Sequence, residues 1–179
     1  MDCVDAPGRV LAGAEATEAQ QFLDHAADLA RTARCLRSRC GSVIVASSGA
    51  GPALTGSGVN SPPDGCPIER CFKPDLPAGF RSDRTCCVHA EQNAILDALR
   101  RHPDQVAGSR LYFIRLDELG RPTPAGVPYC TICSKLTQAA GIAEFVLLHA
   151  AGITVYGADD YNRLSYRHAD IPTTERNAP

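Results

Sequence analysis

The 179-residue sequence has no long apolar run, and its first residues are acidic and show no cleavable signal pattern. A helix that crosses a bilayer needs about 20 mostly apolar residues, so this absence argues against a membrane protein. The sequence also has no basic excess, since 18 Lys and Arg face 20 Asp and Glu. General nucleic-acid binding rests on such an excess and is therefore not expected. The sequence shows no repeats or low-complexity tracts. Because it has neither a long apolar run nor a signal pattern, the chain is predicted to be a soluble cytoplasmic protein.

Length and hydrophobic content predict one domain. A chain of 179 residues with 44% hydrophobic residues is long enough to bury a sizeable core. We expect a single domain over residues 15–170, preceded by a loose N-terminal segment over residues 1–14. Residues 171–179 are predicted to be a polar tail.

Cysteine is the residue type in excess. Nine cysteines, an odd number, occur without a signal pattern, which argues against a disulfide framework and favours reduced thiols. Two of them, Cys130 and Cys133, lie three residues apart at the start of an apolar helical pattern. His89-Ala90-Glu91 stands at the start of another such pattern.

One imidazole and two thiolates make a three-ligand zinc site with His89, Cys130 and Cys133. Three protein ligands leave a position open for water, whose pKa the metal lowers towards neutrality. Glu91 is then placed to move protons without being a ligand. The alternative is a closed structural site with a fourth ligand such as Cys87.

The pairing of His-x-Glu with a later Cys-x-x-Cys preceded by proline resembles the zinc-dependent cytidine/deoxycytidylate deaminase superfamily. Asn93-Ala94-Ile95 and the loop Gly56–Pro63 extend the resemblance, which covers roughly residues 40–148. One departure is clear: Tyr129, and not Pro128, directly precedes the first cysteine.

The resemblance implies hydrolytic deamination of an aminopyrimidine-type base with release of ammonia, with Zn²⁺ as cofactor and Glu91 as proton shuttle. The main chain at Ala90 and Cys130 would orient the reacting groups, and Asn60 would bind the ring or the sugar. Arg81 or Arg84 is the predicted phosphate contact if the substrate is a nucleotide.

A cytosine nucleoside or nucleotide is the expected substrate, bound as a small molecule by a homo-oligomer, either a dimer or a larger assembly. The alternatives are another base, such as guanine or a modified heterocycle, and a module that edits tRNA or single-stranded DNA. An acidic chain argues against the editing module, because phosphate-backbone binding uses many Lys and Arg contacts.

Hydrophobic periodicity predicts an α/β fold with helices on both faces of one five-stranded mixed sheet, and the resemblance implies that this is a three-layer α/β/α cytidine-deaminase-like sandwich. The predicted helices cover residues 17–36, 88–101 and 130–140, with a short helix or coil over 158–168. The predicted strands cover residues 42–46, 53–59, 110–116, 143–148 and 153–156. The resemblance implies the strand order 2-1-3-4-5. Only four residues separate strands 4 and 5, too few for a parallel crossover, so this pair should be antiparallel.

Three further features leave alternatives open. The irregular stretch 60–86 is predicted to form a pocket wall, and Cys66, Cys71 and Cys86 or Cys87 within it or beside it could hold a second zinc. Glycines in the strand 53–59 could let a ligand approach the backbone closely. The arginines near residues 31–39 form a solvated face, or one of them binds phosphate.

Overall fold

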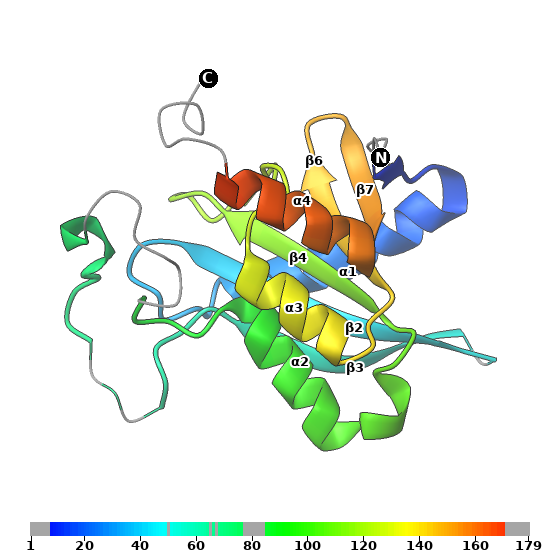
Figure 1. The fold of residues 1–179 in the computed structure, drawn as a ribbon, viewed down its shortest axis with the longest axis horizontal. Coiled ribbons are helices and arrows are strands. Elements are labelled where there is room, and N and C mark those ends of the chain that lie inside the picture. The colour runs from blue at the N-terminus through cyan, green and yellow to red at the C-terminus, as the bar shows by residue number, and fades with distance from the viewer. Residues whose placement is uncertain (1–7, 50, 65, 67, 77–84, 171–179) are drawn as a thin grey trace.

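A mixed sheet of seven strands forms the middle layer of the chain, which we describe from a computed structural model (Figure 1). The structure describes residues 8–49, 51–64, 66, 68–76 and 85–170. The strands are β1 (Arg9–Val10), β2 (Arg39–Ser48), β3 (Gly51–Val59), β4 (Arg110–Leu116), β5 (Pro122–Thr123), β6 (Glu144–His149) and β7 (Gly152–Gly157). The α-helices are α1 (Gly13–Ala30), α2 (Ala90–Arg101), α3 (Thr131–Ala139) and α4 (Ala158–Asp170).

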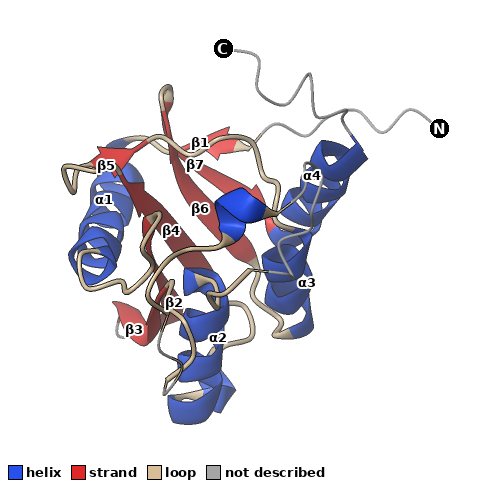
Figure 2. Cartoon of the chain, turned by 90° about the vertical axis from the view of Figure 1, so that its left-hand side faces the viewer, coloured by secondary structure: helices blue, strands red, loops and turns tan. Residues whose placement is uncertain are grey.

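Helices cover both faces of the sheet, as Figure 2 shows, with α1 on one side and α2, α3 and α4 on the other. Each face has its own apolar core. Leu23, Val43 and Tyr112 pack between α1 and the sheet, while Ile95, Leu111 and Phe145 pack on the opposite face. This arrangement confirms the predicted three-layer sandwich. None of the helices in the described part of the chain has both the length and the apolar character of a bilayer-spanning helix.

The strand order β3-β2-β4-β6-β7 confirms the order that the resemblance implies. β6 and β7 pair antiparallel across a tight turn, as the short connection predicts, whereas β4 and β6 are parallel. The predicted count of five strands is wrong. The two additional strands, β1 beside β7 and β5 beside β4, are two residues long. A strand of two residues shows no alternation, so sequence periodicity cannot reveal it.

The first helix begins and ends earlier than the predicted range 17–36. Gly13 takes φ +56° where the chain turns from β1 into α1. Beyond Ala30 the backbone closes a last turn, and the Arg34 N–H then donates to Ser61 Oγ at 3.2 Å. The chain after the helix is therefore held by tertiary contacts that helix propensity does not report. β1 and the start of α1 fall within the predicted N-terminal segment 1–14, while 1–7 and the predicted tail 171–179 lie outside the described residues.

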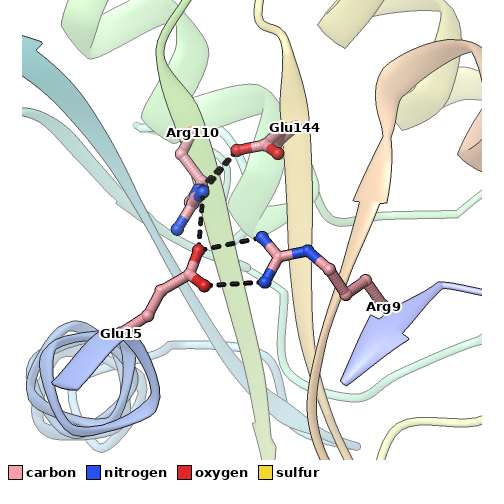
Figure 3. Close-up of polar contacts among 4 residues, drawn as sticks. All are labelled: Arg9, Glu15, Arg110 and Glu144. Carbon is pink, nitrogen blue, oxygen red and sulfur yellow. Dashed lines mark hydrogen bonds and ion pairs between the residues drawn. The ribbon is translucent and has the colours of Figure 1, made fainter. Parts of the chain in front are cut away.

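Four charged side chains tie α1 to three strands at one end of the sheet (Figure 3). Glu15 accepts from both terminal nitrogens of Arg9, at 2.7 and 3.0 Å, and from Arg110 at 3.2 Å. Arg110 also donates through Nε to Glu144 at 2.7 Å. The network therefore links β1, α1, β4 and β6 through alternating charges.

Two glycines of β3, Gly56 and Gly58, make room for the backbone of a helix and not for a ligand. A Cβ atom at Gly58 would lie 2.3 Å from the Ala94 nitrogen and 2.4 Å from the Ala90 oxygen. A Cβ atom at Gly56 would lie 2.5 Å from the Ala94 oxygen. The expectation that a ligand approaches this backbone is thus corrected, because the backbone of α2 occupies the space. This close packing fixes the position of the first turn of α2.

Candidate active site

Two helix starts bring three metal-ligating side chains together. His89 is the N-cap residue of α2, and Cys130 is the N-cap residue of α3. His89 Nδ1 lies 3.2 Å from Cys133 Sγ and 3.4 Å from Cys130 Sγ. In Figure 1 both helices start on the side of the molecule from which the long loop after β3 extends.

The donor set and its spacing fit zinc. Zinc binds Cys sulfur at about 2.3 Å and His nitrogen at about 2.0–2.1 Å, so a tetrahedron needs N–S edges of roughly 3.6 Å. The two observed N–S distances are close to this value. Among the described residues, His89, Cys130 and Cys133 are the one group of three whose ligand atoms all lie within 4.8 Å of one another. Cys87 is not a member of this group. The described residues therefore do not support the alternative of a closed zinc site with Cys87 as the fourth ligand.

The cysteine pair is prepared to bind a cation. The Cys133 thiol donates to Cys130, which lowers the pKa of Cys130 to about 4 against the opposing effect of burial, and His89 lowers it further. The same hydrogen bond raises the pKa of Cys133, with burial adding to the effect. One thiolate is therefore present at neutral pH, and a bound metal would displace the proton of the second.

Glu91 lies in the first turn of α2 with only 6% of its surface exposed. Burial raises the pKa of its carboxyl group, and the nearby negative charge of Cys130 raises it further. A raised pKa favours the protonated carboxyl group and so moves its proton exchange in the direction that a proton shuttle requires.

Of the three ligand-type residues, His89 lines a cavity of about 290 Å³, and Glu91 forms part of the same wall. Among the described residues, the wall contains cations, thiols and two aromatic rings. Its other members are Cys35, Arg37, Ser38, Cys40, Asn60, Cys71, Lys73, Thr85, Cys86, Cys87, Ala90, Phe113, Arg115 and Tyr129. Ala90 is the first residue of α2, so its backbone N–H has no partner within the helix.

Asn60 lies in this wall, but its amide is held by the protein. Its Oδ1 accepts from the Cys40 N–H at 2.7 Å, and its Nδ2 donates to the Ser38 carbonyl at 2.8 Å. Asn60 thus fixes the start of β2 against the end of β3. A contact between Asn60 and a substrate stays a prediction.

Sequence reasoning missed Arg115 and the role of Tyr129. Arg115 on β4 donates to the Tyr129 hydroxyl at 3.0 Å, and both side chains line the cavity. Tyr129 occupies the position where the family motif has proline, and this departure was the available signal. The position of Arg115 on the cavity side of β4 depends on sheet register, which the motif does not encode.

One cation at the cavity comes from the arginine-rich segment 31–39, for which phosphate binding was one of the two predicted roles, and the others come from the loop after β3 and from β4. Arg37, Lys73 and Arg115 line the cavity, while Arg81 and Arg84 lie outside the described residues. Burial lowers the pKa of Lys73, and the positive charges of Arg37 and Arg115 lower it further. Three like charges therefore lie close together around one cavity.

A second zinc site does not form among the described residues. Cys66 is exposed, and neither it nor Cys71, Cys86 or Cys87 belongs to a cluster of three ligand atoms there. Cys71, Cys86 and Cys87 instead line the cavity, so the described part of the stretch 60–86 contributes to the pocket wall.

Residues 16–149 match the family model described as the cytidine and deoxycytidylate deaminase zinc-binding region. No curated protein matches the sequence significantly.

Solved structures share the fold at low sequence identity. A cytidine deaminase from Burkholderia pseudomallei superimposes with a TM-score of 0.52 at 17% identity, covering 79% of this chain and 94% of that one. The dCMP deaminase of cyanophage S-TIM5, in its apo form, gives a TM-score of 0.51 at 20% identity, covering 72% of this chain and 80% of that one. Because the family match covers most of the sequence, the chain belongs to the cytidine and deoxycytidylate deaminase family of zinc-dependent hydrolases.

Proposed function

We propose that this chain hydrolytically deaminates a cytosine nucleotide or nucleoside, using a zinc ion held by His89, Cys130 and Cys133. The observation that carries the proposal is the gathering of these three side chains, one of which, His89, lines a cavity together with Glu91. When bound, zinc supplies an acidified water molecule.

The chain's own residues would divide the remaining work. Glu91 would accept the proton of the attacking water, pass it to the ring nitrogen and assist the departure of the amino group as ammonia. Its burial and raised pKa support this role. The N–H of Ala90 would orient the amino group or the water, and Phe113 and Tyr129 offer aromatic surface to a planar ring.

The charges of the cavity favour a nucleotide over a nucleoside. Arg37, Lys73 and Arg115 outnumber Glu91, which is the one carboxylate among the described lining residues. A phosphate group would relieve the repulsion among these cations. Arg81 and Arg84 remain predicted phosphate contacts.

Ammonia release should be measured with zinc-loaded protein on free bases, nucleosides, nucleotides, single-stranded DNA and tRNA. We expect dCMP or CMP to be the fastest substrate. Deamination of a polynucleotide faster than any monomer at equal concentration would contradict the small-molecule substrate. If guanine reacts faster than the cytosine compounds, guanine and not cytosine is the base that the enzyme deaminates.

Arg37→Ala tests the phosphate contact. We expect kcat/KM for dCMP to fall about tenfold or more while that for deoxycytidine changes little, since one charge-assisted hydrogen bond contributes about 1.5–3 kcal/mol. Arg39→Ala is the matched control, because Arg39 is exposed and is not among the residues that line the cavity. If the ratio of kcat/KM for dCMP to kcat/KM for deoxycytidine is the same in Arg37→Ala as in the parent, Arg37 does not contact the phosphate. Arg81→Ala and Arg84→Ala should then be compared in the same way.

A further inference from the structure

The residue directly before the proposed zinc ligand Cys130 is bonded to the sheet through its side chain. This residue is Tyr129, whose hydroxyl accepts a hydrogen bond from Arg115 Nη2 at 3.0 Å. The zinc deaminase signature has proline at this position. Proline locks its own φ at about −65°, whereas tyrosine leaves both backbone dihedrals free to rotate. The chain that enters Cys130 therefore lacks a covalent constraint that the signature supplies.

Arg115 can hold Tyr129 in place because its own backbone lies between two strands. In β4 it pairs with Cys40 of β2 on one side and with Thr123 of β5 on the other. Thr123 Oγ1 also donates to the Arg115 carbonyl at 3.2 Å. The guanidinium group is planar and presents its N–H donors in a fixed fork, so its bond has a defined direction. The bond from Arg115 therefore ties Tyr129 to the sheet itself.

The segment that leads from β5 into α3 contains no helix or strand, so contacts with the sheet must place it. Near its start, the Ala125 N–H donates to the Leu148 carbonyl of β6 at 2.6 Å. Val127, in the middle, is exposed. At its end, Tyr129 is bonded to Arg115 of β4. The end that enters the zinc ligand is thus attached to the sheet through a side chain.

The position of Cys130 matters because a metal tolerates little error. Cys130 is buried, and its Sγ lies 3.4 Å from His89 Nδ1. Metal–ligand distances in proteins hold to within about 0.2 Å, so a ligand on a poorly fixed backbone binds metal more weakly.

We propose that Arg115 is a positioning residue that acts through Tyr129. Their hydrogen bond fixes the chain entering Cys130 and performs the task that the proline ring performs in the signature. The inference rests on the proposed function in one respect, since it takes Cys130 as a zinc ligand.

Charge and positioning predict opposite effects of Arg115 on zinc binding. A guanidinium group at the same cavity repels a cation, so by charge alone its removal should strengthen zinc binding. If Arg115 positions Cys130, its removal should weaken zinc binding. Loss of a hydrogen bond made directly to a ligand costs about 10–100-fold in metal affinity. The Arg115–Tyr129 bond is exposed and one residue away from the ligand, so we expect a smaller loss, about threefold to tenfold.

The test titrates the zinc-loaded full-length protein with a competing chelator, and the zinc released gives the dissociation constant. Tyr129→Phe removes only the hydroxyl, and Arg115→Met keeps an unbranched side chain without N–H donors. Each should weaken zinc binding about threefold to tenfold, and the double variant should be no weaker than either single variant, because the two residues make one bond. Arg121→Gln is the matched control and should change nothing, since Arg121 pairs with Asp117 just after β4 and is not among the residues that line the cavity.

Tyr129→Pro restores the covalent constraint while it removes the hydroxyl. If the hydrogen bond stands in for the proline ring, Tyr129→Pro combined with Arg115→Met should bind zinc more tightly than Tyr129→Phe combined with Arg115→Met. Equal dissociation constants for these two double variants would contradict that role. The comparison holds the charge constant, because both double variants lack the same guanidinium group.

Unchanged or stronger zinc binding by Arg115→Met and Tyr129→Phe would overturn the proposal, and so would additive losses in the double variant. Urea unfolding in excess chelator separates positioning from a purely structural role. Positioning predicts that the metal-free midpoint of each variant stays close to that of the parent, and a loss as large without zinc as with it would count against the proposal. Zinc affinity is measured without substrate, so an enzyme that deaminates cytosine compounds but shows no Arg115–Tyr129 coupling would refute this inference alone.

Discussion

Glu91 and Asn60 are both buried polar side chains at the same cavity, yet their surroundings suit them to different tasks. Asn60 is fixed by hydrogen bonds to the backbone of Ser38 and Cys40. Glu91 is surrounded by the ligand-type residues and has a pKa that burial raises. We infer that Asn60 mainly maintains the wall of the cavity and that Glu91 is free to exchange protons.

Asn60→Ala should lower the free energy of unfolding by about 1–3 kcal/mol, because the Cys40 N–H would lose its acceptor in a buried position. Urea denaturation provides the measurement. Ser38→Ala is the matched control, since it removes only the 3.4 Å contact to the hydroxyl and keeps the 2.8 Å bond to the carbonyl. An effect below about 0.5 kcal/mol for Asn60→Ala would show that the amide is not structural.

The sequence predicted the residues of the proposed zinc site because their chemistry is encoded locally. A His-x-Glu and a Cys-x-x-Cys at helix starts can each be recognised from a few neighbouring residues, although the fold brings the two motifs together. Arg115 and Lys73 could not be predicted, because they reach the cavity from a strand and a loop whose positions depend on the tertiary fold.

At the scale of elements, the packing of α2 on β3 positions His89 and Glu91. Gly58→Ala would place a Cβ atom 2.3 Å from the Ala94 nitrogen, so the first turn of α2 must shift. We expect a loss of about 1–3 kcal/mol in stability and weaker zinc binding. Thermal unfolding and a competitive zinc titration measure these effects.

Gly126→Ala is the control for this substitution, because a Cβ atom at Gly126 meets nothing within 4 Å and its φ is not positive. If Gly58→Ala binds zinc as tightly as Gly126→Ala does, the packing of β3 does not position the site.

The charge network around Glu15 predicts a dependence of stability on pH. The hydrogen bonds from Arg9 lower the pKa of Glu15 from 4.5 to about 2. A lowered pKa in the folded state contributes stability above about pH 4.5, and this contribution is lost as the pH falls towards 2. The side chain of Glu15 is 35% exposed, so we expect only about 1 kcal/mol.

Glu15→Gln should therefore be less stable than the parent at pH 7, with the difference vanishing between about pH 4.5 and 2. Denaturant unfolding at several pH values gives the comparison. Glu18→Gln, an exposed change on the same helix, should show no such difference. A constant difference across the pH range would exclude the proposed linkage.

The sequence predicted most elements to within a few residues because their apolar periods are long and regular. It failed at β1, β5 and the end of α1, which are determined by contacts with distant segments. The antiparallel β6–β7 pair was predictable because the connection between the two strands is too short for a parallel crossover.

At the scale of the whole molecule, the sheet topology brings the starts of α2 and α3 together. A metal bound there links two segments that are separated by β4 and its following loop. Ligands that bind only the folded state stabilise it. A chelator should therefore lower the midpoint of thermal unfolding, and added zinc should restore it. Cys130→Ala should show no response to either reagent, and a full zinc complement in this variant would contradict the ligand assignment.

The most direct measurement is turnover by Glu91→Gln together with its zinc content. Ammonia release from cytosine nucleotides should fall by about 100-fold to 10,000-fold, the range that general acid–base catalysis supplies. Zinc should stay at one ion per chain, because Glu91 is not a ligand in this account. Turnover close to that of the parent, or loss of the zinc, would contradict the assignment of Glu91 as the proton shuttle of a zinc-dependent deaminase.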